Sequence, residues 1–96
     1  IQILSKRQLS EAENLLVAAD VNAVPPVGIE GVGINDMGVD LPETPQNAIG
    51  LGALAIGDVK YKLHLKLFEM MKNAETPLFL DHNRAFDVAR KIVDKL

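Results

Sequence analysis

The pattern of apolar and polar positions sets one short segment near the start apart from the rest. Residues 5–13 are polar, with Leu9 and Ala12 three positions apart, and suit a short surface helix. The run Leu15–Ala19 is wholly apolar, shows no alternation and is too short for a core helix, which predicts a strand buried on both faces, as in a parallel sheet. A parallel strand needs neighbours, and no second run of this quality follows. We therefore expect the rest of the sheet elsewhere in a longer polypeptide.

The segment from Val21 to Gly57 is rich in proline and glycine. It holds four of the five prolines and the five glycines from Gly28 to Gly50. Glycine permits positive φ and proline interrupts regular structure, so this segment is predicted to be a long loop, with no strand at residues 45–49. A loop of this length inside a compact domain is uncommon unless it is functional.

Two helices are predicted in the second half of the chain. From about Leu51 to Asn73, apolar residues recur at helical spacing, as at Leu63, Leu67 and Met70. The alternation of apolar residues and lysine or histidine over residues 60–67 permits a strand instead, but the length favours a helix. Asp81 is a good N-cap for a final helix. One face of that helix is marked by Ala85, Phe86, Ala89, Ile92, Val93 and Leu96.

Composition limits the possible functions. The chain has 96 residues and a net charge of −3, with acids and bases interspersed, so nucleic-acid binding has no electrostatic support. Cysteine is absent, which excludes disulfides and fits a reducing compartment. No apolar run reaches the roughly 18 residues that a membrane span requires. No clustered histidines or carboxylates have metal-ligand spacing, and no metal is predicted.

Candidate chemistry begins where the predicted strand ends. Asp20 and Asn22 follow the carboxyl end of the strand, which is where ligands bind in open α/β sheets. The alternative is that both side chains only cap the loop by bonding nearby backbone. The pair Pro25-Pro26 stiffens the loop, and one of its proline bonds could be cis.

Two further motifs allow a functional and a structural interpretation. Residues 50–55 fit the dinucleotide pattern G-x-G-x-x-A, but no strand is expected before them. The alternative is that the glycines let the start of a helix pack closely against another backbone. Lys60 and His64 share a helix face. That face is either simply solvated or aims a lysine into a cleft, where it would bind an anionic or carbonyl-bearing ligand.

Several of these strings resemble one family. Residues 19–31 (ADVNAVPPVGIEG) closely resemble a motif of the NADP-dependent methylene-tetrahydromethanopterin dehydrogenases, some of which also act on methylene-tetrahydrofolate. Residues 50–57 with 60–64 resemble a second block, and Asp81 resembles the start of the terminal helix. The resemblance spans the whole chain but covers only about the last third of a family member. The family's phosphate-binding glycine loop and its first domain lie upstream.

The resemblance implies an α/β fold, with the C-terminal part of a Rossmann-type parallel sheet and two long C-terminal helices. Residues 1–49 would end the NADP domain, and residues 50–96 would pack toward an N-terminal substrate domain. The implied reaction moves a hydride from the methylene carbon to NADP+. Such a piece of the enzyme is expected to be inactive by itself. A cytoplasmic homo-oligomer is expected.

The resemblance also implies roles for individual residues. Lys60 would be the catalytic lysine close to the pterin, with Gly52 and His64 also at the substrate. The nicotinamide end of NADP would meet the loop after the strand, at Asp20, Asn22, Ala23 and Pro25, and Gly50, Gly52 and Gly57 would permit close backbone approach. Two alternatives stay open: a related dehydrogenase with another substrate, and a non-catalytic domain that self-associates through apolar faces.

Overall fold

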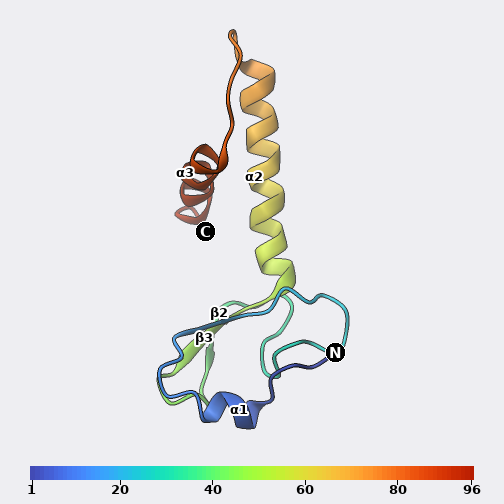
Figure 1. Ribbon diagram of the computed structural model, residues 1–96, viewed down its shortest axis with the longest axis vertical. Coiled ribbons are helices and arrows are strands. Elements are labelled where there is room, and N and C mark those ends of the chain that lie inside the picture. Colours follow the sequence, from blue (N-terminus) through green and yellow to red (C-terminus); the bar gives the residue numbers. More distant parts are fainter. The chain divides into compact units, whose positions relative to one another are not determined.

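The computed structural model describes all residues from Ile1 to Leu96 (Figure 1). The elements follow the order α1 (Lys6–Ser10), β1 (Val17–Ala19), β2 (Met37–Leu41), β3 (Ala48–Leu51), α2 (Ala53–Asn73) and α3 (His82–Val93). The chain divides into two compact units, Ile1–Ile56 and Gly57–Leu96. The first unit holds the sheet and the second holds most of α2 and all of α3.

The sheet has three strands in the order β1-β3-β2. β1 pairs with β3 in parallel, with Val17 opposite Ile49 and Ala19 opposite Leu51. β2 pairs with β3 in antiparallel orientation, with an irregularity between Met37 and Val39. The parallel pairing expected of the first strand is thus observed, and β2 adds an antiparallel strand to it. The expectation of a strandless segment between residues 21 and 57 is wrong. The neighbour of the first strand comes from this same segment.

β1 is shorter and more exposed than its apolar sequence predicted. Of its three residues only Ala18 is buried, and the side chains of Leu16 and Val17 are 66% and 48% exposed. β1 is an edge strand whose second face is uncovered, because the core lies on the Ala18 side. Burial on both faces is thus not observed.

The core of the first unit is small and lies on one side of the sheet. It consists of Ala18, Val32, Leu41 and Ala48, with Leu15 and Ile29 packed against it. Leu41 and Val32 are the largest fully buried side chains, and burial of such a side chain contributes about 1.5–3 kcal/mol.

The turn between β2 and β3 is fixed by a buried threonine. The hydroxyl of Thr44 donates to the carbonyl oxygen of Leu41 at 2.6 Å and accepts the N–H of Ala48 at 2.7 Å. Asn47, with φ of 50°, takes the left-handed conformation that asparagine tolerates well. These contacts set the register in which β3 enters the sheet.

The helix α1 is the predicted surface helix. Ser5 and Gln8 form a reciprocal capping box at its start, and Leu9 is its one buried residue. Just before it, the N–H groups of Ile3 and Leu4 both donate to the carbonyl oxygen of Gly28, at 2.8 and 3.0 Å. The start of the chain is thereby tied to the end of the loop that follows β1.

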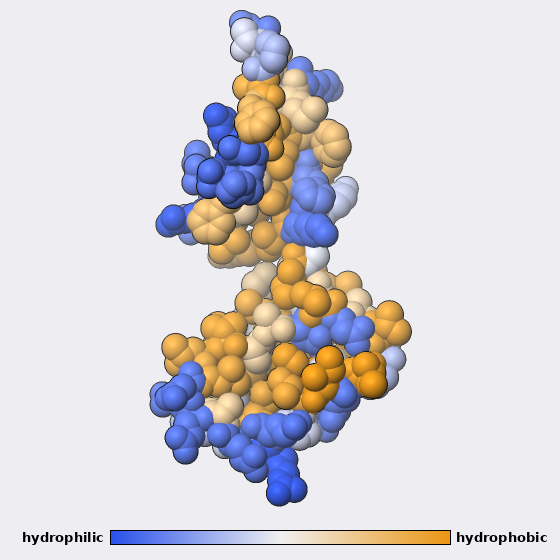
Figure 2. All heavy atoms as spheres, in the orientation of Figure 1, coloured by the Kyte–Doolittle hydropathy of each residue, from blue (hydrophilic) through white to orange (hydrophobic).

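The second unit is helical, as predicted. α2 runs unbroken to Asn73, so the alternative of a strand over residues 60–67 is wrong. The predicted N-cap of α3 is confirmed, because the carboxylate of Asp81 accepts the N–H of Arg84 at 3.0 Å. Neither α2 nor α3 has a buried residue, and apolar side chains are visible on the surface (Figure 2). No helix combines the length and apolar character needed to cross a membrane.

Candidate functional site

Two chain segments with candidate residues meet at one edge of the sheet. Because β1 and β3 are parallel, their carboxyl ends lie side by side, with Ala19 opposite Leu51. The N–H of Asp20 continues this pairing by donating to the carbonyl oxygen of Leu51 at 2.9 Å. The loop that begins at Asp20 and the junction at Gly52 are therefore neighbours at the edge where open α/β sheets bind ligands.

The carboxylate of Asp20 is the centre of the loop after β1. One oxygen, Oδ1, accepts the N–H of Asn22 at 2.9 Å. The other, Oδ2, accepts the N–H groups of Gly28 at 2.7 Å and Ile29 at 3.1 Å. The pKa of this carboxyl lies below its ordinary value because these N–H groups, that of Asn22 above all, stabilise the charged form, although burial opposes the shift. A buried carboxylate thus closes the loop from residue 20 to residue 28.

Asn22 holds the inside of the same loop. Its Nδ2 donates to the carbonyl oxygens of Val24 and Pro26, both at 2.9 Å, and its Oδ1 accepts the N–H of Val24 at 3.1 Å. The Pro25–Pro26 peptide bond is cis, the isomer that the sequence left open. The polar side-chain atoms of Asn22 are thus hydrogen-bonded to the loop backbone.

The outer surface of the loop is apolar. Val21 and Val24 are 79% and 71% exposed, and Ala23 and Pro25 are also exposed. Asp20 and Asn22 have the loop-capping geometry that the sequence allowed as an alternative. They set the shape of the loop, and its exposed rim is the part that a ligand would meet.

The junction between β3 and α2 differs from the sequence expectation. A strand does precede the glycine pattern, so the prediction of none at residues 45–49 is wrong. The N–H groups of Leu54 and Ala55, in the first turn of α2, donate to the carbonyl oxygen of Ile34 at 2.7 and 3.3 Å. These donors are the ones a pyrophosphate would need. These N–H groups at the start of α2 are therefore already hydrogen-bonded to this chain's own backbone.

The glycines at and near this junction differ in how much space a Cβ atom would have. A Cβ at Gly52 would lie 2.5 Å from the carbonyl carbon of Ile34, so close packing of the helix start against another backbone is confirmed. A Cβ at Gly50 would lie 3.2 Å from a methyl group of Val32, which is contact with a side chain. A Cβ at Gly57 would meet nothing within 4 Å in this chain, so no close approach to its own backbone occurs there.

Lys60 and His64 lie one turn apart on α2, and both are exposed. Lys60 makes no ion pair, whereas Lys62 is paired with Asp58 at 2.7 Å. His64 lines an apolar groove of about 330 Å³ in the second unit together with Leu67, Phe68, Met71 and Leu80. The imidazole of His64 thus borders an apolar groove, and the unpaired ammonium group of Lys60 belongs to the residue one turn earlier on the same helix.

The sequence did not reveal this groove. Phe68 fell outside the predicted apolar face of α2, and Leu80 belongs to the segment before α3. The segment that connects α2 to α3 brings Leu80 to the side of α2. No group of three or more His, Cys, Asp or Glu side chains that would hold a metal ion is present.

Comparison with known proteins places this geometry in context. No protein-family model matches the sequence. The chain is 45% identical over 92 residues, 96% of its length, to the NAD(P)-dependent methylenetetrahydromethanopterin dehydrogenase of Methylorubrum extorquens. The chain is a relative of this dehydrogenase. The resemblance found in the sequence is thus confirmed.

The match covers the C-terminal portion of the dehydrogenase and 30% of its length. The aligned region leaves out only about four residues, so it includes both the loop after β1 and the whole of α2. The relative's printed name gives NAD(P) as its cofactor and leaves open the choice between NAD and NADP.

Proposed function

We propose that this chain serves an oxidoreductase of one-carbon metabolism that transfers a hydride from 5,10-methylene-tetrahydromethanopterin, or methylene-tetrahydrofolate, to NADP+. The observation that carries the proposal is the 45% identity to a methylenetetrahydromethanopterin dehydrogenase over 96% of the chain. The chain would form the C-terminal portion of that enzyme and would be inactive without the rest.

The sheet of the first unit has an open edge at β1, where further strands would pair. The outer edge of β1 has no partner strand, and the neighbouring side chains of Leu16 and Val17 are exposed. An open edge with apolar neighbours is suited to receive another strand. We propose that the preceding polypeptide supplies parallel strands here, and that the whole is a Rossmann-type domain.

The loop after β1 would contact the nicotinamide end of NADP. Its rim, with Ala23 and Pro25, is exposed and apolar, as the face of a planar ring requires. Asp20 and Asn22 would act by fixing the loop through the hydrogen bonds described above. NADP supplies the hydride acceptor, and the protein positions the two rings at reacting distance. Preference for NADP over NAD would depend on residues upstream.

Lys60 would act on the pterin. Loss of hydride leaves a methenyl product with positive charge on the pterin, so a nearby ammonium group would not stabilise the reacting carbon directly. Lys60 would instead donate hydrogen bonds to a polar edge of the ring system and hold it in place. His64 and the apolar groove beside it would contact the same substrate, and Gly52 would let the chain approach closely.

The test is hydride transfer by the full-length protein with each methylene-pterin, followed as the absorbance of NADH with NAD+ or of NADPH with NADP+. We expect turnover with at least one pterin and a loss of about a hundredfold or more in kcat/KM for Lys60→Gln. Lys62→Gln is the matched control, since Lys62 already pairs with Asp58, and should keep nearly full activity. Absence of turnover with both pterins would contradict the proposal and favour a related dehydrogenase with another substrate.

We also propose self-association and a cytoplasmic location. Phe79 and Phe86 in the second unit are 85% and 63% exposed, more apolar surface than a short helical unit usually leaves bare. The lack of cysteine fits a reducing compartment. Light scattering of the full-length protein measures the oligomer, and a monomer at micromolar concentration would contradict this part.

A further inference from the structure

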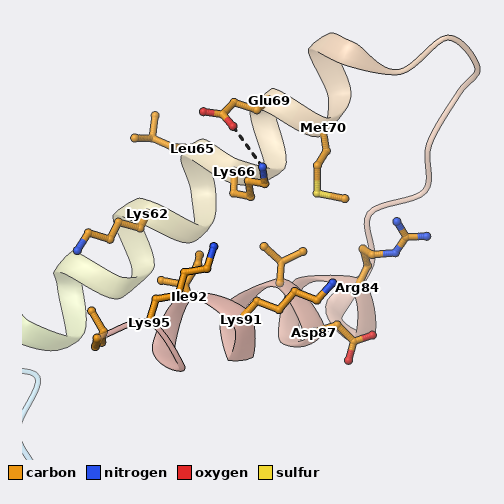
Figure 3. Close-up of a pocket in the computed structure, with 12 residues that line it drawn as sticks. Lys62, Leu65, Lys66, Glu69, Met70, Arg84, Asp87, Lys91, Ile92 and Lys95 are labelled. Atoms are coloured by element: carbon orange, nitrogen blue, oxygen red, sulfur yellow. Dashed lines mark ion pairs between the residues drawn. The ribbon is translucent and has the colours of Figure 1, made fainter.

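A groove of about 890 Å³ lies between α2 and α3 in the second unit (Figure 3). Its lining is unusually basic, with five lysine or arginine side chains against two carboxylates. The two carboxylates are those of Glu69 and Asp87. The groove is therefore a concave surface with an excess of positive charge.

Two of the five cations are already paired, and three are not. Lys62 Nζ lies 2.7 Å from Asp58, and Lys66 Nζ lies 3.6 Å from Glu69. The remaining cations, Arg84, Lys91 and Lys95, make no ion pair. Arg84 and Lys91 lie seven positions apart on α3, so they share one flank of the helix, and Lys95 lies in the turn just after it. The unpaired charge is thus concentrated along one wall of the groove.

The floor between the two helices is apolar. Leu65 and Met70 line it from α2, and Val88 and Ile92 line it from α3. A solvated basic face would account for the lysines, but such a face is normally convex and has no apolar floor. The helical rise of about 1.5 Å per residue puts Arg84 and Lys91 about 10 Å apart along the axis of α3. Lys95 follows in the turn after the helix.

We propose that this groove binds an extended anion in which two or more phosphate or carboxylate groups are joined by a short apolar stretch. Arg84, Lys91 and Lys95 would bind the anionic groups, Arg84 through its planar fork, and the apolar floor would contact the linking atoms. The proposal does not depend on hydride transfer. Lys60 does not line this groove, and His64 lines the separate apolar groove.

Isothermal titration calorimetry of the full chain tests the proposal with three probes. Suberate carries two carboxylates on an apolar chain, hexane-1,6-diyl bisphosphate carries two phosphates on an apolar chain, and inorganic phosphate is the single-anion comparator. We expect suberate or the bisphosphate to bind at least about tenfold more tightly than inorganic phosphate. Preference for suberate would identify carboxylates as the ligand groups, and preference for the bisphosphate would identify phosphates.

Two double variants that remove the same amount of charge distinguish binding at the groove from a general effect of the protein's net charge. Lys91→Gln with Lys95→Gln should weaken binding at least about tenfold. Lys72→Gln with Arg90→Gln removes the same charge outside the groove, since Arg90 lies over the Phe86 ring at 6.0 Å, and should change affinity by less than about twofold. Equal weakening by both pairs, or no binding of either extended anion at millimolar concentration, would overturn the proposal. Circular dichroism checks that both variants keep their helices.

Discussion

Replacing Asp20 by asparagine tests whether the loop after β1 is held by a charge. The substitution keeps the shape of the side chain but exchanges one accepting oxygen for an N–H₂ group. In the better of its two orientations, the amide oxygen takes the place of Oδ2 and still accepts from Gly28 and Ile29. The N–H₂ group then faces the N–H of Asn22, so a hydrogen bond is replaced by two opposed donors.

The expected loss follows from the number of bonds affected. Losing one charge-assisted hydrogen bond in a buried setting costs about 1.5–3 kcal/mol. The two bonds that remain become neutral and weaken, because hydrogen bonds to an ionised group are about twice as strong. We therefore expect Asp20→Asn to lower the free energy of unfolding by about 3 kcal/mol, equivalent to a factor of more than about a hundred.

Two measurements on the full-length protein report this loss. Urea unfolding should show a lower midpoint with an unchanged slope. Native-state hydrogen exchange should show faster exchange of the Gly28 and Ile29 amides. Asp36→Asn is the control, since Asp36 makes one exposed bond of the same type, to the N–H of Gly33 at 2.7 Å, and should cost less than about 1 kcal/mol. If both variants shift the midpoint equally and the two amides stay protected, the reasoning is refuted.

The same hydrogen bonds to the carboxylate of Asp20 predict how the free energy of unfolding depends on pH. The pKa of Asp20 is lower in the folded chain than in the unfolded chain. The stabilisation is therefore complete above the unfolded value of about 3.9 and is lost as pH falls through the folded value. The wild-type protein should lose more stability than Asp20→Asn between pH 5 and pH 2, conditions that bracket the unfolded value. Parallel acid-titration curves for the two proteins would contradict this.

Three further substitutions are expected to have distinct effects on the free energy of unfolding, each measured by urea titration. Gly52→Ala should cost about 3 kcal/mol or more, because its Cβ would lie 2.5 Å from the backbone of Ile34. Gly57→Ala, its control, should stabilise α2 by up to about 1 kcal/mol, because nothing lies within 4 Å of the new Cβ. Asp81→Ala should cost about 1 kcal/mol by removing the cap on the N–H of Arg84. Reversal of the order of the two glycine variants would refute the packing argument.

The helices were predictable from sequence because their signals are local. The spacing of Leu63, Leu67 and Met70 and the N-cap at Asp81 each act within a few residues. β2 and β3 carry no such signal. β3 consists of Ala48, Ile49, Gly50 and Leu51, residues that alternate poorly and include a weak strand former. It forms a strand because its neighbours pair with it on both sides, and pairing between distant segments cannot be read from one segment.

The candidate site was predictable in part for the same reason. The capping roles of Asp20 and Asn22 were recognised as an alternative because these residue types commonly bond nearby backbone. The partners of Asp20 at Gly28 and Ile29 lie eight and nine residues away and depend on the path of the whole loop. Likewise, the contact of Gly52 with Ile34 was foreseen as a type of packing, but its partner was not.

The hydrogen bonds at the carboxyl edge of the sheet bear on which part of a dinucleotide would meet it. The first-turn N–H groups of Leu54 and Ala55 are occupied by the carbonyl oxygen of Ile34, and the carboxylate of Asp20 adds a negative charge close by. An anionic pyrophosphate would find these N–H groups already hydrogen-bonded, and the carboxylate of Asp20 would repel it. The exposed loop rim around Ala23 and Pro25 is uncharged and held rigid from inside. Under the proposed function, this edge therefore suits the nicotinamide, and the phosphates would be bound by residues that precede the matched region.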